Sequence, residues 1–145
     1  MTPRTPIKTK PVVSVPRNAT VLEAAQAMVE RNVGATVIVE ADRLLGIFTE
    51  RDVVTRVVLR KLKPETTPVT SVMTTEVKTV REDADRSSIL QLMNAHHIRH
   101  LPVVDAEGRV VTMLSMRQLL RAEVNDLQQT VWELVADTAI DGAGG

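Results

Sequence analysis

One short segment of the chain combines residue types that can hold a sugar-phosphate ligand. It reads Gly46-Ile47-Phe48-Thr49-Glu50-Arg51-Asp52, a pattern that predicts a strand entering a helix. A helix start presents free amides and a partial positive charge. The carboxylate of Asp52, one turn along, can accept both hydrogens of a vicinal diol such as that of ribose, and Arg51 can meet phosphate. Gly46 removes a side chain where a planar base can approach.

The same spacing also has a purely structural interpretation. Thr49 and Asp52 can form a capping box, in which their side chains satisfy free amides at the helix start. A second segment, Thr112 to Gln118, reads Thr-Met-Leu-Ser-Met-Arg-Gln and contains the capping box of Ser115 and Gln118. It keeps the cap but lacks the carboxylate, and Thr112 fills the glycine position. The comparison predicts one stronger site and one weaker or altered site.

The two segments close two copies of one repeated unit. Residues 35–40 match residues 100–105, and Met28 matches Met93, 65 positions later. A unit this short cannot bury its apolar face alone, so the copies should pack together and form two clefts at a shared interface. The predicted fold class is α+β, with two β-α-β-β-α units whose helices cover one face of a small sheet. We expect strands near 12–15, 36–39, 43–48, 77–80, 101–104 and 109–114, and helices near 20–32, 49–60, 85–97 and from 115 onward.

The helices carry two apolar patterns whose faces can be predicted. One face of the first helix is expected to pack on the core through Leu22, Ala25, Met28 and Val29. The last helix carries a heptad pattern formed by Leu120, Val124, Leu127, Val131 and Leu134. Two heptads fit either a helix folded onto its own domain or a contact with a second subunit. The acidic residues that follow Ala122 are expected to lie on solvated faces.

Composition excludes several classes of protein. A formal charge of zero and a pI near 6.8 argue against nucleic-acid binding, and only Phe48 and Trp132 are aromatic. The absence of cysteine excludes disulfides, thiolate metal sites and cysteine nucleophiles. No metal site is expected from His96, His97 and His100, because the helix should end between them. Without an apolar span or a signal-peptide core, we expect a cytoplasmic protein with no membrane insertion. We expect no enzyme, because no nucleophile–base pair is evident.

The two units resemble a tandem pair of CBS domains, named for cystathionine β-synthase, of the small stand-alone bacterial type. The resemblance rests on the junction at 46–52, on the strand start at 97–104 and on Val72-Met73-Thr74, and it covers about residues 8–124. It implies a flexible N-terminus at 1–10, a first repeat at 11–62, a linker at 63–71, a second repeat at 72–124, and a helical extension with a disordered end at 125–145.

The resemblance also implies a regulatory module with no catalytic cofactor. Its ligand would be AMP, ADP, ATP, NAD or S-adenosylmethionine, bound between the repeats. In the stronger cleft, ribose would bind Thr49 and Asp52 of the Gly46 junction, opposite Lys78, Thr79, Ile98 and Arg99, while phosphates would pass Arg51 and His100. The weaker cleft would join Ser115, Arg117 and Gln118 to Val15, Val33 and Gly34. The resemblance further implies a homodimer in which helices pack two modules into a flat disc, and a separate effector protein as a partner. The alternative is a dimerisation or interaction scaffold with vestigial clefts.

Overall fold

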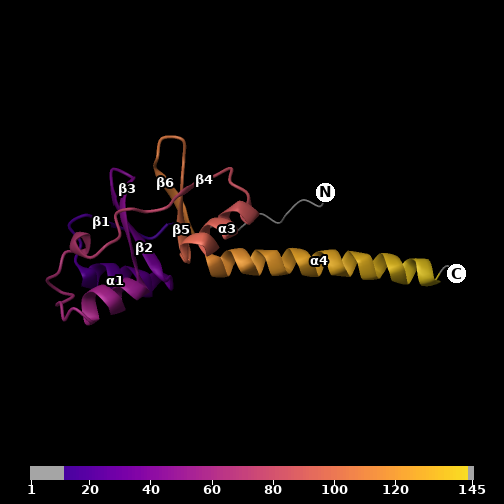
Figure 1. The fold of residues 1–145 in the computed structure, drawn as a ribbon, viewed down its shortest axis with the longest axis horizontal. Coiled ribbons are helices and arrows are strands. Elements are labelled where there is room, and N and C mark those ends of the chain that lie inside the picture. The colour runs from indigo at the N-terminus through magenta and orange to yellow at the C-terminus, as the bar shows by residue number, and fades with distance from the viewer. Residues whose placement is uncertain (1–11, 144–145) are drawn as a thin grey trace.

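The structure of the chain is a computed structural model that describes residues 12–143, with side chains up to Thr138. The expected flexible segment at residues 1–10 lies outside the described residues. Two similar bodies lie side by side, and one long helix extends from the second (Figure 1). Each body contains a three-stranded sheet, so the class is α+β, as predicted.

The first repeat has the predicted order of elements. In its sheet the central strand β2 pairs in parallel with β1 and antiparallel with β3. The helix after β3 is α-helical for only one turn and then continues as a π-helix. The elements are β1 (Ser14–Pro16), α1 (Val21–Arg31), β2 (Ala35–Glu40), β3 (Arg43–Thr49), α2 (Glu50–Asp52) and the π-helix η1 (Val53–Val58).

The second repeat has the same topology after a short connecting 3-10 helix. Its strands pair in the order β4-β5-β6, and each repeat has a register shift at the same place, after Ile38 in β2 and after Val103 in β5. The expected strand at 77–80 is reduced to two residues. The elements are η2 (Val69–Ser71), β4 (Val80–Arg81), α3 (Arg86–His96), β5 (His100–Val104), β6 (Val110–Ser115) and α4 (Met116–Ala143).

Local signals set the ends of these elements. Thr20 and Glu23 form a capping box at the start of α1. The residues that end the first helix of each repeat, Asn32 and His97, are both left-handed with φ of 53°. Positive φ at both Ala41 and Asp42 gives the tight β2–β3 turn a twist that suits a hairpin.

The face by which α1 packs on the sheet differs from the prediction. Val21, Ala24 and Met28 are buried, whereas Leu22 is 40% exposed and Val29 is 81% exposed. Both stripes of α1 are apolar, so periodicity alone does not tell which stripe meets the sheet. Of the four residues predicted to face the core, only Met28 is buried. The exposed stripe that includes Leu22 and Val29 remains available for another partner.

The sheets are buried on both faces rather than covered on one. Ile38 and Phe48 pack in the helix-side cluster of the first repeat. Their neighbours Val37 and Ile47 are also buried, and alternation along a strand turns them to the opposite face. Along the outer edge of β3, the backbone of Ile47 pairs with Thr74, which follows the first repeat in the chain.

The segment assigned to a linker is part of the first repeat's packing. Val69 and Val72 are buried in the first hydrophobic cluster, although Val72 had been placed in the second repeat. The backbone amide of Val21 donates to the carbonyl of Thr67, and that of Val69 donates to the carbonyl of Ala19. These contacts cover the start of α1 with the connection, so the connection is not a free tether.

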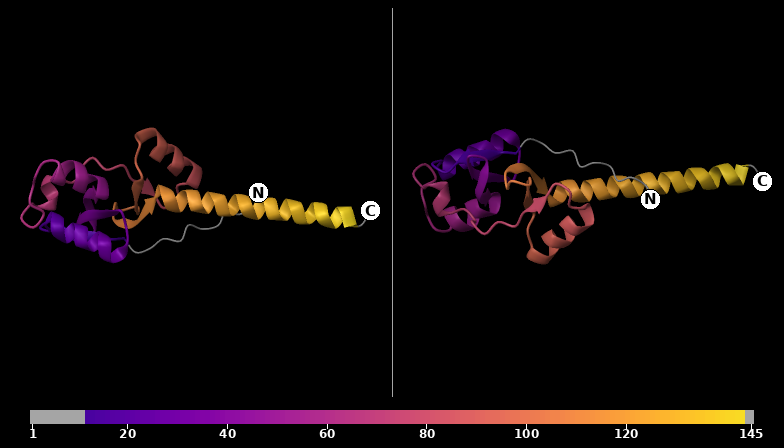
Figure 2. Two further views of the ribbon diagram at one scale, coloured as in Figure 1. Left: turned by 90° about the horizontal axis from the view of Figure 1, so that it is seen from below. Right: turned by 90° about the horizontal axis from the view of Figure 1, so that it is seen from above.

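Helix α4 projects away from both repeats (Figure 2). It runs to Ala143, through residues assigned to a disordered end. Its base is held by buried Arg86 of α3, whose Nη1 lies 3.2 Å from Glu123 Oε1 and 2.7 Å from Asp126 Oδ2. These two acids were expected to be solvated, but they attach α4 to α3. The heptad residues from Leu120 to Leu134 are nevertheless 50–62% exposed, so the alternative in which the last helix covers its own domain with this seam is wrong.

Candidate functional site

The end of β3 brings Thr49 and Asp52 together at the start of α2. Thr49 Oγ1 accepts from the Asp52 amide at 3.3 Å, and Asp52 Oδ2 accepts from the Thr49 amide at 2.9 Å. The same Oδ2 atom accepts from the Thr49 hydroxyl at 3.1 Å. Asp52 is only 8% exposed. The pair is thus a formed capping box with a buried carboxylate.

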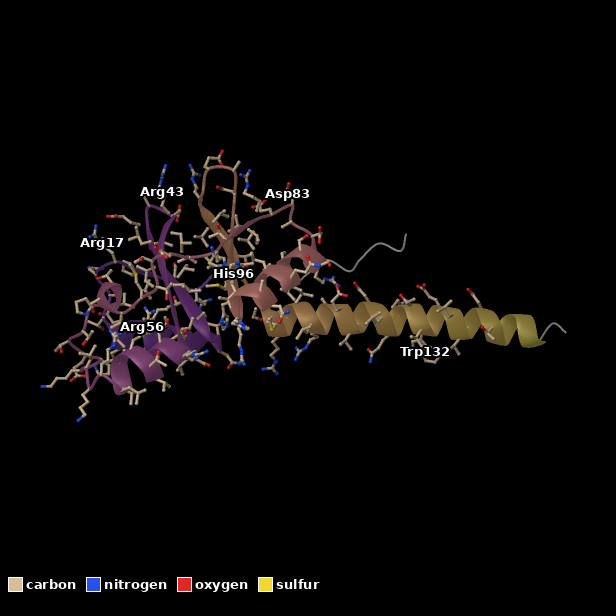
Figure 3. All side chains as sticks on the ribbon, in the orientation of Figure 1. Arg17, Arg43, Arg56, Asp83, His96 and Trp132 are labelled. Carbon is tan, nitrogen blue, oxygen red and sulfur yellow. The ribbon has the colours of Figure 1, made fainter. Side chains whose placement is uncertain are left out.

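The second carboxylate oxygen of Asp52 faces a residue that the sequence analysis missed. Asp52 Oδ1 lies 3.6 Å from Arg56 Nε, and Arg56 Nη1 donates to the carbonyls of Val72 and Met73 at 3.1 Å each. Figure 3 shows Arg56 among the side chains of the first repeat. Spacing of four residues on one helix was the available signal for this pair. Because Oδ2 is occupied by the cap, Oδ1 is the oxygen left to receive a new donor.

The space beside Gly46 is filled by protein. A Cβ built at Gly46 would lie 2.5 Å from Met73 Sδ and 2.8 Å from the carbonyl oxygen of Thr74. This glycine therefore lets the Met73–Thr74 segment cross close to β3, and the expectation of an open face for a planar base is not what the structure shows. The equivalent position in the second repeat holds buried Thr112.

The start of β5 meets the first repeat next to this junction. A Cβ at Gly34 would lie 3.2 Å from His100 Nε2 and 3.5 Å from Glu50 Oε2, and the Glu50 amide donates to the Gly34 carbonyl at 3.0 Å. Burial lowers the pKa of His100 from 6.5, Glu50 acts in the opposite direction, and the charge of Arg99 lowers it further. His100 of the second repeat thus lies at a contact with the first repeat. Its neighbours there are Gly34 and Glu50, the first residue of α2.

The remaining residues of the predicted stronger cleft are solvent-accessible. Arg51, Lys78, Thr79 and Arg99 are exposed, and Ile98 is half-buried against the second cluster. Among the described residues, no hydrogen bond or ion pair joins Lys78, Thr79 or Arg51 to the Thr49–Asp52 pair. The exposed cationic residues of the predicted cleft are therefore Arg51, Lys78 and Arg99.

The second junction repeats the cap with an amide. The Ser115 amide donates to Gln118 Oε1 at 3.2 Å, and the Gln118 amide donates to Ser115 Oγ at 3.1 Å. The Met116 amide donates to the carbonyl of Arg99 at 2.8 Å, the counterpart of the Glu50–Gly34 bond. Of the other residues assigned to this cleft, Arg117 is exposed, Val15 is buried, and Val33 and Gly34 are half-buried. The cap is as the sequence analysis expected, and Gln118 places an amide where the first junction has a carboxylate.

Three other features of the described residues bear on function. No group of three or more His, Cys, Asp or Glu residues there is arranged to hold a metal ion. No described helix has the length and apolar character needed to cross a membrane. One surface groove, of about 420 Å³, lies between α3 and α4 and is lined in part by Leu90, Met116 and Leu120.

Sequence comparison places both repeats in one family. The sequence profile of the CBS domain matches residues 6–59 and 69–125. An uncharacterized 17.7 kDa protein of Acidianus ambivalens is 38% identical over 117 residues, which are 80% of this chain and 70% of that protein. CBS domain-containing protein CBSCBSPB5 of Arabidopsis thaliana is 35% identical over 82% of this chain, but the match spans only 22% of that longer protein.

Solved structures agree with this assignment. A putative signal-transduction protein with CBS domains from Burkholderia ambifaria has a TM-score of 0.75 and 33% identity, over 79% of this chain and 84% of the other. CBS domain protein PAE2072 from Pyrobaculum aerophilum, solved with AMP, has a TM-score of 0.72 and 29% identity over 77% and 86%. The CBS domain pair of protein MJ0100, solved with 5′-methylthioadenosine and S-adenosyl-L-methionine, has a TM-score of 0.71 and 26% identity over 78% and 92%. With two profile matches over two structurally equivalent repeats, this chain belongs to the CBS domain family.

Proposed function

We propose that this chain is a regulatory module that binds an adenosine-containing ligand at the Asp52 junction between its repeats. The observation that carries the proposal is the hydrogen-bonded Thr49–Asp52 pair, with its buried carboxylate at a helix start. The relatives solved with AMP and with S-adenosyl-L-methionine share the fold and support the ligand class. Candidate ligands are AMP, ADP, ATP, NAD and S-adenosylmethionine.

The geometry suggests how the ligand would be held. Asp52 Oδ1 would accept from a ribose hydroxyl in place of its long contact with Arg56, while Oδ2 keeps the cap. The exposed side chains of Arg51, Lys78 and Arg99 would attract phosphate. His100 and Glu50 would line the boundary between the repeats. Gly46 would act indirectly, since it lets Met73 pack against β3 and thereby positions the segment that Arg56 binds.

In this proposal the protein has no catalytic role and acts in the cytoplasm. Its output would be a change in how a separate effector recognises it, since ligand binding at a contact between two repeats favours one relative arrangement of them. The Ser115–Gln118 junction would form a weaker second cleft. It retains the cap but offers a neutral amide where the first cleft has a carboxylate.

Thermal unfolding with each candidate ligand tests this function. A ligand that binds only the folded state stabilises it by about 2.7 kcal/mol at 100 times its Kd, and for a chain of this size that raises Tm by several degrees. We expect at least one adenosine ligand at millimolar concentration to do so, and uridine monophosphate to serve as the matched control. An unchanged Tm with all five ligands would rule the function out.

A dimerisation scaffold with vestigial clefts is the second candidate, and the exposed apolar surface favours it. Leu22 and Val29 on α1 and Val54 and Val58 on η1 are exposed in the first repeat. The groove between α3 and α4 is the equivalent face of the second repeat. We propose that these faces pair two copies of the chain into a homodimer. Dimer formation without any response to ligand would support the scaffold over the sensor.

A further inference from the structure

We propose that the α4 helices of two copies of this chain pair in parallel and in register, as a two-stranded coiled coil. The contact runs along the heptad seam from Leu120 to Leu134. This inference goes beyond ligand sensing, and it does not depend on either cleft being occupied.

The first observation is that the seam is long, apolar and uncovered. Its members are 50–62% exposed although all are Leu or Val, and Trp132 beside them is 71% exposed. Beyond its base, where α3 packs against it, no other described element runs along α4 in Figures 1 and 2, and Figure 3 shows Trp132 on the projecting part. Monomeric proteins seldom expose a contiguous apolar surface of this kind without a partner for it. The seam members are Leu120, Val124, Leu127, Val131 and Leu134.

The residue types along the seam indicate the kind of partner. Val124 and Val131 occupy the a positions, and Leu120, Leu127 and Leu134 occupy the d positions. A β-branched residue at a with leucine at d favours a parallel pair of helices over larger assemblies, because each shape fits the hole that a parallel partner offers. A second copy of α4 supplies this pattern.

The register follows from which residues would meet. In a parallel, in-register pair each of the five seam residues lies opposite its own copy. An antiparallel pair must match a with d. The antiparallel register that sets Val124 opposite Leu134 also sets Leu120 opposite Thr138 and brings Glu123 beside Asp137 of the second copy, two like charges. Only the parallel arrangement keeps every seam residue against another apolar seam residue.

The charges of α4 are compatible with the parallel pair. Its acids would repel a second copy if they flanked the seam, but Asp126 and Glu133 occupy c positions that point away from it. Glu123 occupies a g position, where it meets the uncharged Gln128 of the second copy, whose amide can donate to a carboxylate. The same Glu123 carboxylate is also paired with Arg86 in its own chain.

The base of α4 connects the seam to the body of the protein. Leu120 is the first seam residue and also lines the α3–α4 groove together with Leu90 and Met116. The ion pairs of Arg86 with Glu123 and Asp126 fix the direction in which α4 leaves α3. A second copy paired along the seam therefore adjoins the α3–α4 groove, one of the faces proposed above to pair two copies of the chain.

Disulfide trapping tests the arrangement, because the chain contains no cysteine. In the full chain, Leu134→Cys and Leu127→Cys each place a thiol at a d position, and Gln129→Cys places one on the outer face as the matched control. Thiols facing each other in one dimer have an effective concentration in the millimolar range, about that of a short tether. We expect the two d-position variants to convert to covalent dimers under mild oxidation while Gln129→Cys stays largely monomeric on a denaturing gel.

Mixing experiments distinguish the possible failures. If Leu134→Cys crosslinks to Val124→Cys in preference to itself, the pair is antiparallel and the proposal is wrong. If neither d-position variant crosslinks faster than Gln129→Cys, the seam does not pair with itself, and an effector or another partner covers it. The ligand-induced Tm shift of unmodified protein is measured separately, so failure of the coiled coil leaves the ligand proposal to its own test.

Discussion

Replacing Asp52 with alanine separates the two roles that this residue has in the structure. The change leaves Thr49 in place as the N-cap but removes the acceptor for the Thr49 amide and hydroxyl, so α2 loses the reciprocal half of its capping box, at a cost of about 0.5–1.5 kcal/mol in the free energy of unfolding. It also removes the charged acceptor proposed for ribose, worth about 1.5–3 kcal/mol. The second loss corresponds to a roughly 10- to 150-fold weaker Kd for the nucleotide.

The matched control is Glu23→Ala, because Glu23 holds the same position in the capping box of α1 but lies outside both clefts. Urea unfolding should show a stability loss for both variants, and a larger loss for Asp52→Ala because Asp52 is buried and also contacts Arg56, whereas Glu23 is exposed. Calorimetric titration with the ligand that raises Tm should show weakened binding only for Asp52→Ala. Equal Kd values for the two variants would refute a ligand role for the carboxylate.

The second cleft provides an internal comparison for the same experiment. Gln118→Ala removes the side-chain acceptor for the Ser115 amide in the same way, while Ser115 Oγ still accepts from the backbone amide of residue 118. Because an amide lacks the charge that strengthens a hydrogen bond to ribose, this change should weaken binding less than Asp52→Ala does. Equal losses of affinity at the two positions would contradict the asymmetry between the junctions.

Three further outcomes are expected. Truncation after Gln128 keeps the acids that pair with Arg86 but removes the seam residues beyond Leu127. Sedimentation should then show a dimer Kd raised by about tenfold or more, which corresponds to a loss of roughly 1.4 kcal/mol of binding free energy. An unchanged Kd would mean that this outer part of the seam adds nothing to dimer stability. Burial lowers the pKa of His100 from 6.5, so on acidification the unfolded chain takes up the proton before the folded protein does, and the free energy of unfolding falls as the pH drops below 6.5. Urea unfolding at several pH values below 6.5 should show a weaker pH dependence of this free energy in His100→Gln. Gly46→Ala places a methyl group 2.5 Å from Met73 Sδ and 2.8 Å from a backbone oxygen, and overpacking of this kind costs about 1–3 kcal/mol, so an unchanged Tm would show that the Met73 segment moves freely.

Much of the fold could be predicted because its signals are local. The capping boxes at Thr20, Thr49 and Ser115 each need only two side chains three residues apart, and all three form. The two-residue turn at Ala41-Asp42 and the repeat of strand and helix patterns likewise depend on near neighbours in the chain. The assignment to tandem CBS repeats followed from these same local patterns occurring twice.

Contacts between distant residues were decided only by the tertiary structure. Which apolar stripe of α1 faces the sheet depends on neighbouring elements, since Val21 and Leu22 are equally apolar. Met73 fills the space at Gly46 only because segments 27 positions apart in the chain meet. Likewise, Arg86 holds two acids of α4 that lie 37 and 40 positions further along the chain. Periodicity describes a helix or strand by itself, whereas these contacts depend on how the elements pack, and packing determines both the surroundings of Asp52 and the exposure of the α4 seam.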